Sequence, residues 1–240
     1  MYSINCRVRY SEIDENKRLD LGSVINYFQD CSTFQSEDLG IGLNWLSSRH
    51  LAWLLSSWQI VVNRFPGLGE EITVSTWAND FKSLYGTRNF MLKDKDGNVC
   101  AYANSYWIYM DMEKLRPVRI PAEIEALYQP EPRLDMDYAS RKITLPDTEP
   151  VIQSSFPVSH ANIDTNHHVN NGQYIKMAEG YLPKDFSLRQ MRAEYKMSAV
   201  LNDIIVPYTY ETDKAFYVSL ANEQGKPFTV VEFTRNGNGE

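Results

Sequence analysis

Two segments of the chain resemble each other, and this repeat constrains the fold more than any other feature of the sequence. The first covers residues 13–25 (IDENKRLDLGSVI) and the second residues 163–175 (IDTNHHVNNGQYI). They share Ile, Asp, Asn, Gly and a final Ile at matching places, where average composition gives about one identity by chance. We therefore predict two similar halves related by duplication.

The first half shows one helix followed by several strands. A strand is expected at residues 4–10, and the next apolar residues have the spacing of one buried helix face: Val24, Ile25, Tyr27, Phe28 and Cys31. Alternating or β-rich runs then predict strands at 51–63, 71–81, 87–93 and 99–111, with a hairpin turn at 94–97.

The second half repeats this order. A strand is expected at 156–160, and a helix is expected from the apolar residues Tyr174, Ile175, Met177 and Ala178. Strands are predicted at 189–198, 204–212, 215–222 and 228–234, with a turn at 223–226. The pattern of one long helix and an antiparallel sheet, given twice, predicts an α+β architecture.

A proline-rich stretch separates the two halves. Six of the 11 prolines fall within residues 116–150, and proline removes backbone donors and fixes φ. We place the N-terminal domain at residues 1–130, a linker at 131–150 and the C-terminal domain at 151–240. A short helix is expected around 122–128, and the tail 235–240 is expected to fray.

Composition excludes several classes of protein. A net charge of −7 argues against a nucleic-acid protein that neutralises phosphates. No run approaches the roughly 20 apolar residues of a membrane helix, and no secretory signal is visible, so neither membrane insertion nor export is expected. The three cysteines lack CxxC spacing and the four histidines form no HExxH pattern, so a reducing cytoplasm, no metal and no cofactor are predicted.

The strongest candidate for chemistry is the loop before the second helix. Asp164, Asn166 and His168 alternate, so an extended loop would point all three the same way. Asn170 and Asn171 follow where the helix begins, and its free N–H groups can bind a developing oxyanion. Asp164 would activate water, Asn166 would orient the water or polarise a carbonyl, and His168 would bind or protonate.

Comparison of the halves separates structural from reactive residues. Asp14 and Asn16 occupy the same places in the first half, but Arg18 stands opposite His168. The shared Asp and Asn are therefore expected to be partly structural, because such residues are common in turns and caps. What the second half adds is His168 and the asparagine pair. This predicts a working site there and a retired one in the first half.

Residues 162–175 (NIDTNHHVNNGQYI) closely resemble the active-site segment of plant and bacterial acyl-acyl-carrier-protein thioesterases, D-x-D-x-N-x-H-V-N-N-x-x-Y. The resemblance extends over nearly the whole chain, including residues 9–14 (RYSEID) and 194–196 (EYK). It implies tandem hot-dog domains, each a long helix wrapped by a curved antiparallel sheet. It also implies catalytic roles for Asp164, Asn166 and His168, whereas the first Asp of the pattern is replaced by Asn162.

One departure from the family pattern changes the expected mechanism. The adjacent Glu-Cys pair of the plant members is Ser198 and Ala199 in this chain, so a cysteine nucleophile at that place is excluded. Water activated by a carboxylate remains. Asn171, Glu194 and Ser198 are possible auxiliary residues.

The resemblance implies hydrolysis of fatty acyl-carrier-protein thioesters to free fatty acid and carrier protein. Two alternatives stay open: an acyl-CoA thioesterase or hydratase on the same fold, and a non-catalytic acyl-thioester sensor. Acyl-chain length and saturation are not fixed by the sequence, and a homodimer is possible.

The acyl slot is expected in the first half, and an acidic carrier protein needs a local basic surface. Lys176 and Arg192 are predicted to help its docking. Aromatic candidates for the slot, for each of which core packing is the more common role, are Tyr27, Phe28, Trp53, Trp58 and Trp107.

Overall fold

The computed structural model describes residues 1–164 and 166–236 and divides the chain into two compact units. The first consists of residues 1–56 and 60–138, and the second of residues 57–59 and 139–240. Residues 237–240 of the tail that was expected to fray lie outside the described part. No helix in the described part is long and apolar enough to cross a membrane.

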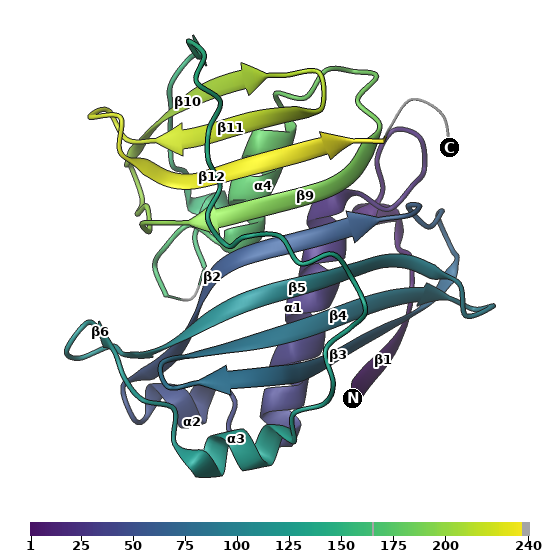
Figure 1. Cartoon of the computed structure of the whole chain (residues 1–240), viewed down its shortest axis with the longest axis vertical. Helices are drawn as coiled ribbons and strands as arrows, with labels where there is room; N and C mark the ends of the chain where they lie inside the picture. The colour runs from purple at the N-terminus through teal and green to yellow at the C-terminus, as the bar shows by residue number, and fades with distance from the viewer. Residues whose placement is uncertain (165, 237–240) are drawn as a thin grey trace. The chain divides into compact units, whose positions relative to one another are not determined.

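The N-terminal unit is a helix on an antiparallel sheet (Figure 1). Its strands follow the order β1-β3-β4-β5-β2, and β6 (Arg116–Pro117) pairs with the end of β5. The other strands are β1 (Tyr2–Arg7), β2 (Leu51–Val62), β3 (Glu71–Lys82), β4 (Tyr85–Asp94) and β5 (Val99–Asp111). The helical elements are η1 (Tyr10–Glu12), α1 (Leu21–Asp38), α2 (Leu43–Ser47) and α3 (Ala122–Tyr128).

Helix α1 packs on the face that the sequence predicts. The side chain of Asp20 accepts a hydrogen bond from the N–H of Ser23 at 2.6 Å, which caps the first turn. The predicted face is buried, and the ring centroid of Phe28 lies 5.1 Å from that of Phe90 on β4. Figure 1 shows α1 crossing one face of the sheet, which is the hot-dog arrangement.

The C-terminal unit repeats this plan with a shorter helix. Its sheet order is β9-β12-β11-β10-β7, with β8 also pairing β10. The helix is half as long as α1, nine residues against 18, because Gly180 and Pro183 follow it. The elements are β7 (Val151–Ile152), β8 (Phe156–Pro157), η2 (His160–Asn162), α4 (Asn171–Glu179), β9 (Leu188–Tyr195), β10 (Ile204–Glu211), β11 (Ala215–Ala221) and β12 (Pro227–Arg235).

The predicted linker is hydrogen-bonded to the sheets over residues 131–143. In the N-terminal unit, Trp77 Nε1 donates to the carbonyl of Pro132 at 2.9 Å, and the N–H of Leu134 donates to Asn89 Oδ1 at 3.1 Å. In the C-terminal unit, Arg192 donates to the carbonyls of Ser140 and Lys142. Residues 131–138 thus belong to the first unit and 139–150 to the second.

Candidate active site

The loop between η2 and α4 is a closed turn. The N–H of Asp164 donates to the carbonyl of His168 at 2.8 Å, and that of His167 to Asp164 at 3.1 Å. Ile163 and Val169 form an antiparallel bridge across its base, and His167 takes a left-handed conformation at φ 61°. The expectation of an extended loop is wrong, because the backbone turns back on itself within five residues.

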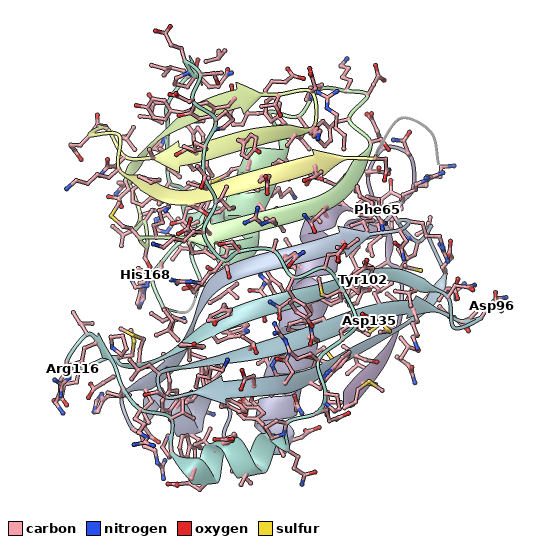
Figure 2. All side chains as sticks on the ribbon, viewed as in Figure 1. Phe65, Asp96, Tyr102, Arg116, Asp135 and His168 are labelled. Atoms are coloured by element: carbon pink, nitrogen blue, oxygen red, sulfur yellow. The ribbon has the colours of Figure 1, made fainter. Side chains whose placement is uncertain are left out.

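The carboxylate of Asp164 holds this turn from inside. Its Oδ1 accepts the N–H groups of Asn166 at 2.7 Å and His168 at 3.3 Å. Oδ2 accepts no hydrogen bond from the residues that the structure describes. The side chain of Asn166 is exposed and that of His168 is half-buried; Figure 2 labels His168 on the loop. The three predicted residues therefore share one turn, with one carboxylate oxygen left for chemistry.

The first half contains the same turn. Oδ1 of Asp14 accepts the N–H groups of Asn16 at 2.8 Å and Arg18 at 2.9 Å, and the N–H of Asp14 donates to Arg18 at 2.8 Å. Lys17 takes the left-handed conformation at φ 60°, as His167 does. The closing of the turn is therefore a property of the fold, common to both units.

The side chains on the two turns differ in chemistry. Where the first half has Arg18 and Leu21, the second has His168 and Asn171. Imidazole can give or take a proton near neutral pH, whereas guanidinium stays charged. The two turns therefore have the same backbone bonds and differ in the side chains that they present.

Asn162 supports the loop from below. Its Oδ1 accepts the N–H of Ser159 at 2.9 Å, and its carbonyl accepts the N–H of Asn170 at 2.9 Å. Asn170 in turn caps α4 by accepting the N–H of Gly172 at 2.8 Å. Asn162 is engaged in capping, a structural role.

Glu12 takes the place of Asn162 in the first half. Its carbonyl accepts the N–H of Asp20 at 2.9 Å, and its carboxylate binds the hydroxyl of Tyr27 at 2.6 Å and the side chain of Arg9 at 2.7 Å. Burial raises the pKa of Glu12, but these bonds outweigh it and hold the pKa below its usual value. The residue that holds the first turn, Glu12, is therefore charged, and the residue that holds the second turn, Asn162, is neutral.

Two tyrosines fasten the neighbouring segment to the loop. The hydroxyl of Tyr174 accepts the N–H of Ala199 at 2.8 Å, and the carbonyl of Ala199 accepts the N–H of Val169 at 2.9 Å. The hydroxyl of Tyr195 donates to the carbonyl of Asn171, the first residue of α4, at 3.1 Å. These contacts join residues far apart in sequence, and the sequence alone did not predict them.

Ser198 and Asn171 lie beside the loop as a result. Ser198 is exposed and precedes Ala199, which is hydrogen-bonded to the residue after His168. Asn171 begins α4, where the N–H groups of Gly172 and Gln173 are bonded to Asn170 and that of Asn171 has no partner among the described residues. Both predicted auxiliary residues are therefore next to the turn.

Glu194 faces the other side of the sheet. Successive strand residues point to opposite faces, and Tyr195 points to α4. Glu194 Oε2 instead accepts the N–H of Ile143 at 3.0 Å and pairs with Lys196 Nζ at 3.0 Å. Figure 1 shows α4 behind this sheet and the connecting chain in front. The structure therefore does not bring Glu194 to the loop.

Arg192 shares that face and is occupied there. Its Nη1 lies 2.6 Å from Glu232 Oε2, and both side chains are 14% exposed. With Nη2 bonded to two carbonyls of the connecting chain, Arg192 is not free to meet a partner. The predicted docking role of Arg192 is replaced by a structural one.

Within the described residues, no group of His, Cys, Asp and Glu is placed to hold a metal.

Known proteins share the fold along the whole chain. An acyl-ACP thioesterase from Bacteroides thetaiotaomicron superposes with a TM-score of 0.89 at 22% identity, covering 98% of this chain and 97% of that one. The 12:0-ACP thioesterase from Umbellularia californica superposes at 0.85 with 18% identity, covering 99% and 97%. These likenesses confirm the predicted fold.

Sequence relatives point the same way. A chloroplastic palmitoyl-acyl carrier protein thioesterase of Arabidopsis thaliana is 25% identical over 226 residues, 87% of this chain and 54% of the relative. An oleoyl-acyl carrier protein thioesterase 2 of the same plant is 24% identical, over 82% of this chain and 59% of the relative. The chain spans between half and two thirds of the length of these relatives.

Family models match both units. The acyl-ACP thioesterase N-terminal domain matches residues 1–128, and the acyl-ACP thioesterase C-terminal domain matches residues 146–223. The second match contains the turn with Asp164, Asn166 and His168. This chain therefore belongs to the acyl-ACP thioesterase family.

Proposed function

We propose that this chain hydrolyses fatty acyl-carrier-protein thioesters to free fatty acid and carrier protein, with the turn at residues 164–168 as the reactive site. Family membership supports the reaction class. The observation that carries the assignment is the pair of identical turns, of which only the second presents His168 and Asn171. Because both turns have the same backbone bonds, the aspartate closes the turn in both units. The proposed chemistry depends on the side chains that only the second turn has.

Asp164 Oδ2 is the proposed base in this reaction. It takes a proton from water while the water oxygen attacks the thioester carbonyl carbon. Asn166 holds the water, and the N–H of Asn171 at the start of α4 stabilises the negative oxygen that forms. When the tetrahedral intermediate collapses, the C–S bond breaks, and the leaving sulfur receives the proton that Asp164 took from water, either directly from that carboxyl or relayed through His168.

A water nucleophile fits the positions of the cysteines. Cys6, Cys31 and Cys100 all belong to the N-terminal unit. Burial raises the pKa of Cys31 to about 12, and burial also raises the pKa values of Cys6 and Cys100. A thiol with a raised pKa is a poor nucleophile at neutral pH.

Asp164→Asn tests the base without destroying the turn. The Asn side-chain oxygen can still accept the N–H groups of Asn166 and His168, but it cannot take a proton from water. We expect turnover of acyl-carrier substrates to fall roughly a hundredfold or more. Steady-state kinetics with carrier-protein and CoA thioesters of several acyl lengths measure this effect and identify the preferred carrier.

Asp14→Asn is the matched control, because it makes the same change on the same turn in the other unit. It should leave turnover close to that of the wild type. If Asp164→Asn keeps full turnover, the proposed base is wrong. If the wild type hydrolyses neither class of thioester, the proposed function is wrong.

Lys176 is the proposed contact for the acidic carrier protein. It is exposed on α4, five residues after Asn171, which is about 7 Å along a helix. Lys176→Glu should raise KM for the carrier-protein substrate and leave kcat unchanged. Lys214→Glu is the control. Lys214 is exposed and follows the last residue of β10, and the eight residues of that strand span about 25 Å. Equal KM values for the two variants would contradict the docking role.

A further inference from the structure

The N-terminal unit buries a guanidinium that no described carboxylate neutralises. Arg88 on β4 is 7% exposed, and its Nη1 donates to Gln35 Oε1 at 2.5 Å and Thr76 Oγ1 at 3.1 Å. A guanidinium carries five N–H donors, yet Nε and Nη2 donate to none of the residues that the structure describes. Because a buried charge with unspent donors is costly, Arg88 has the chemistry to bind an acceptor that is not part of the chain.

Tyr109 supplies a second hydrogen-bond donor that has no partner within the described chain. It lies on β5 with 1% of its surface exposed, and within the described chain its hydroxyl has no hydrogen-bond partner. Burial, followed by the neighbouring Tyr128, raises the pKa of Tyr109 to about 12, so the hydroxyl keeps its proton at neutral pH. A buried phenol in this state can donate one hydrogen bond.

Tyr128 joins these two donors into one cluster. Its ring centroid lies 5.2 Å from Arg88 Cζ, and it packs in the same buried group as Tyr109. Its own hydroxyl is engaged with Ser36 Oγ at 2.9 Å. We call Gln35, Thr76, Arg88, Tyr109 and Tyr128 the Arg88 cluster.

The Arg88 cluster adjoins the apolar contact between α1 and the sheet. Phe90, which packs on Phe28, is two residues from Arg88 on β4 and therefore points to the same face. Gln35 is two helical turns from Phe28, about 10 Å along α1. An acyl group held between α1 and the sheet would meet these donors at one end of the apolar contact.

We propose that the Arg88 cluster recognises an oxygen substituent, such as a hydroxyl group, on the bound acyl group. This rests on the proposed function, because it takes the acyl group as the occupant of the N-terminal unit. An unsubstituted alkyl chain offers no acceptor and leaves the donors of Arg88 and Tyr109 unspent. A hydroxylated chain accepts from them and is therefore bound more tightly.

Calorimetry with acyl-pantetheine analogues tests this preference without turnover. The sulfur is replaced by NH, so that the ligands are not hydrolysed, and medium-chain analogues are compared with and without a mid-chain or terminal hydroxyl. The wild type should bind one hydroxylated analogue roughly tenfold or more tightly than the plain one. Tyr109→Phe and Arg88→Met should each reduce that ratio strongly.

Arg133→Met is the control, because Arg133 is exposed and stacks on Tyr138 in the same unit. It should keep the wild-type ratio. If Arg88→Met does not fold, Tyr109→Phe, which removes a single oxygen, still tests whether the preference for the hydroxylated analogue depends on the Arg88 cluster. Equal wild-type affinities for plain and hydroxylated analogues would overturn the inference, as would a ratio that survives in Tyr109→Phe and every folded Arg88 variant. Selective binding without thioester hydrolysis would contradict only the proposed function.

Discussion

The two oxygens of Asp164 have different surroundings, and this difference would let the proposed base also hold its own turn closed. Oδ1 is spent on backbone N–H groups, as is that of Asp14, so half of each carboxylate acts as an internal brace. The sequence comparison anticipated a partly structural aspartate. It did not anticipate the closed turn, because alternation of residue types carries no information about backbone bonds between Asp164 and His168.

Glu12 makes the stability of the N-terminal unit depend on pH. Its pKa in the folded chain lies below its usual value, so the stabilisation is present above the unfolded pKa and is lost as pH falls through the folded one. We expect the urea midpoint to fall more steeply between about pH 6 and about pH 3 in the wild type than in Glu12→Gln.

Glu113→Gln is the control for this titration, because Glu113 is exposed. It should retain the wild-type slope. Parallel slopes for the wild type and Glu12→Gln would show that Glu12 contributes no such dependence. The second unit offers an internal comparison, because Asn162 at the matching place does not titrate.

Helix α4 is short, and its position is fixed by contacts at its first turn. The start of α4 at Asn170 and Asn171 was predicted from the sequence. The bonds from Tyr174 to Ala199 and from Tyr195 to Asn171 were not, because they depend on how β9 lies against the helix. Strand β8 is also shorter than predicted, ending at Pro157, which gives way to η2.

Tyr195→Phe removes the hydroxyl that holds the first carbonyl of α4. We expect a loss of about 1 kcal/mol in the free energy of unfolding and a lower kcat with KM unchanged, because the helix start would be less firmly placed. Urea unfolding and steady-state kinetics measure the two effects.

Tyr210→Phe removes a hydroxyl on β10, away from α4, and serves as the control. It should change kcat little. If both variants lower kcat equally, Tyr195 has no specific part in placing the helix.

Both units of the whole molecule have the same layers: a helix on one face of a sheet and the connecting chain on the other (Figure 1). The repeat in the sequence predicted the helices and the sheets. The proline content of residues 116–150 predicted a linker over the surface, and Trp77, Asn89, Arg192 and Glu194 bond this segment to the sheets. Proline predicts the absence of regular structure, and it does not predict the absence of contacts.

Arg192→Met should loosen the connecting chain over residues 139–143. It removes the ion-pair partner of Glu232 and frees two carbonyls, so we expect a loss of about 1–3 kcal/mol in the free energy of unfolding. Hydrogen exchange should become faster at Ile143, whose N–H binds Glu194. Lys142→Ala, which keeps the carbonyl, is the control, and unchanged exchange in Arg192→Met would contradict the bracing role.

The closed turn also bears on how such a protein can change over generations. Its shape is set by backbone groups and one aspartate oxygen, so folding places little demand on the side chain at its fifth place. Substitutions at this place in one duplicated copy therefore have little effect on the fold. Arg18 in one copy and His168 in the other show how far two descendants of one turn can diverge while the scaffold beneath them stays the same.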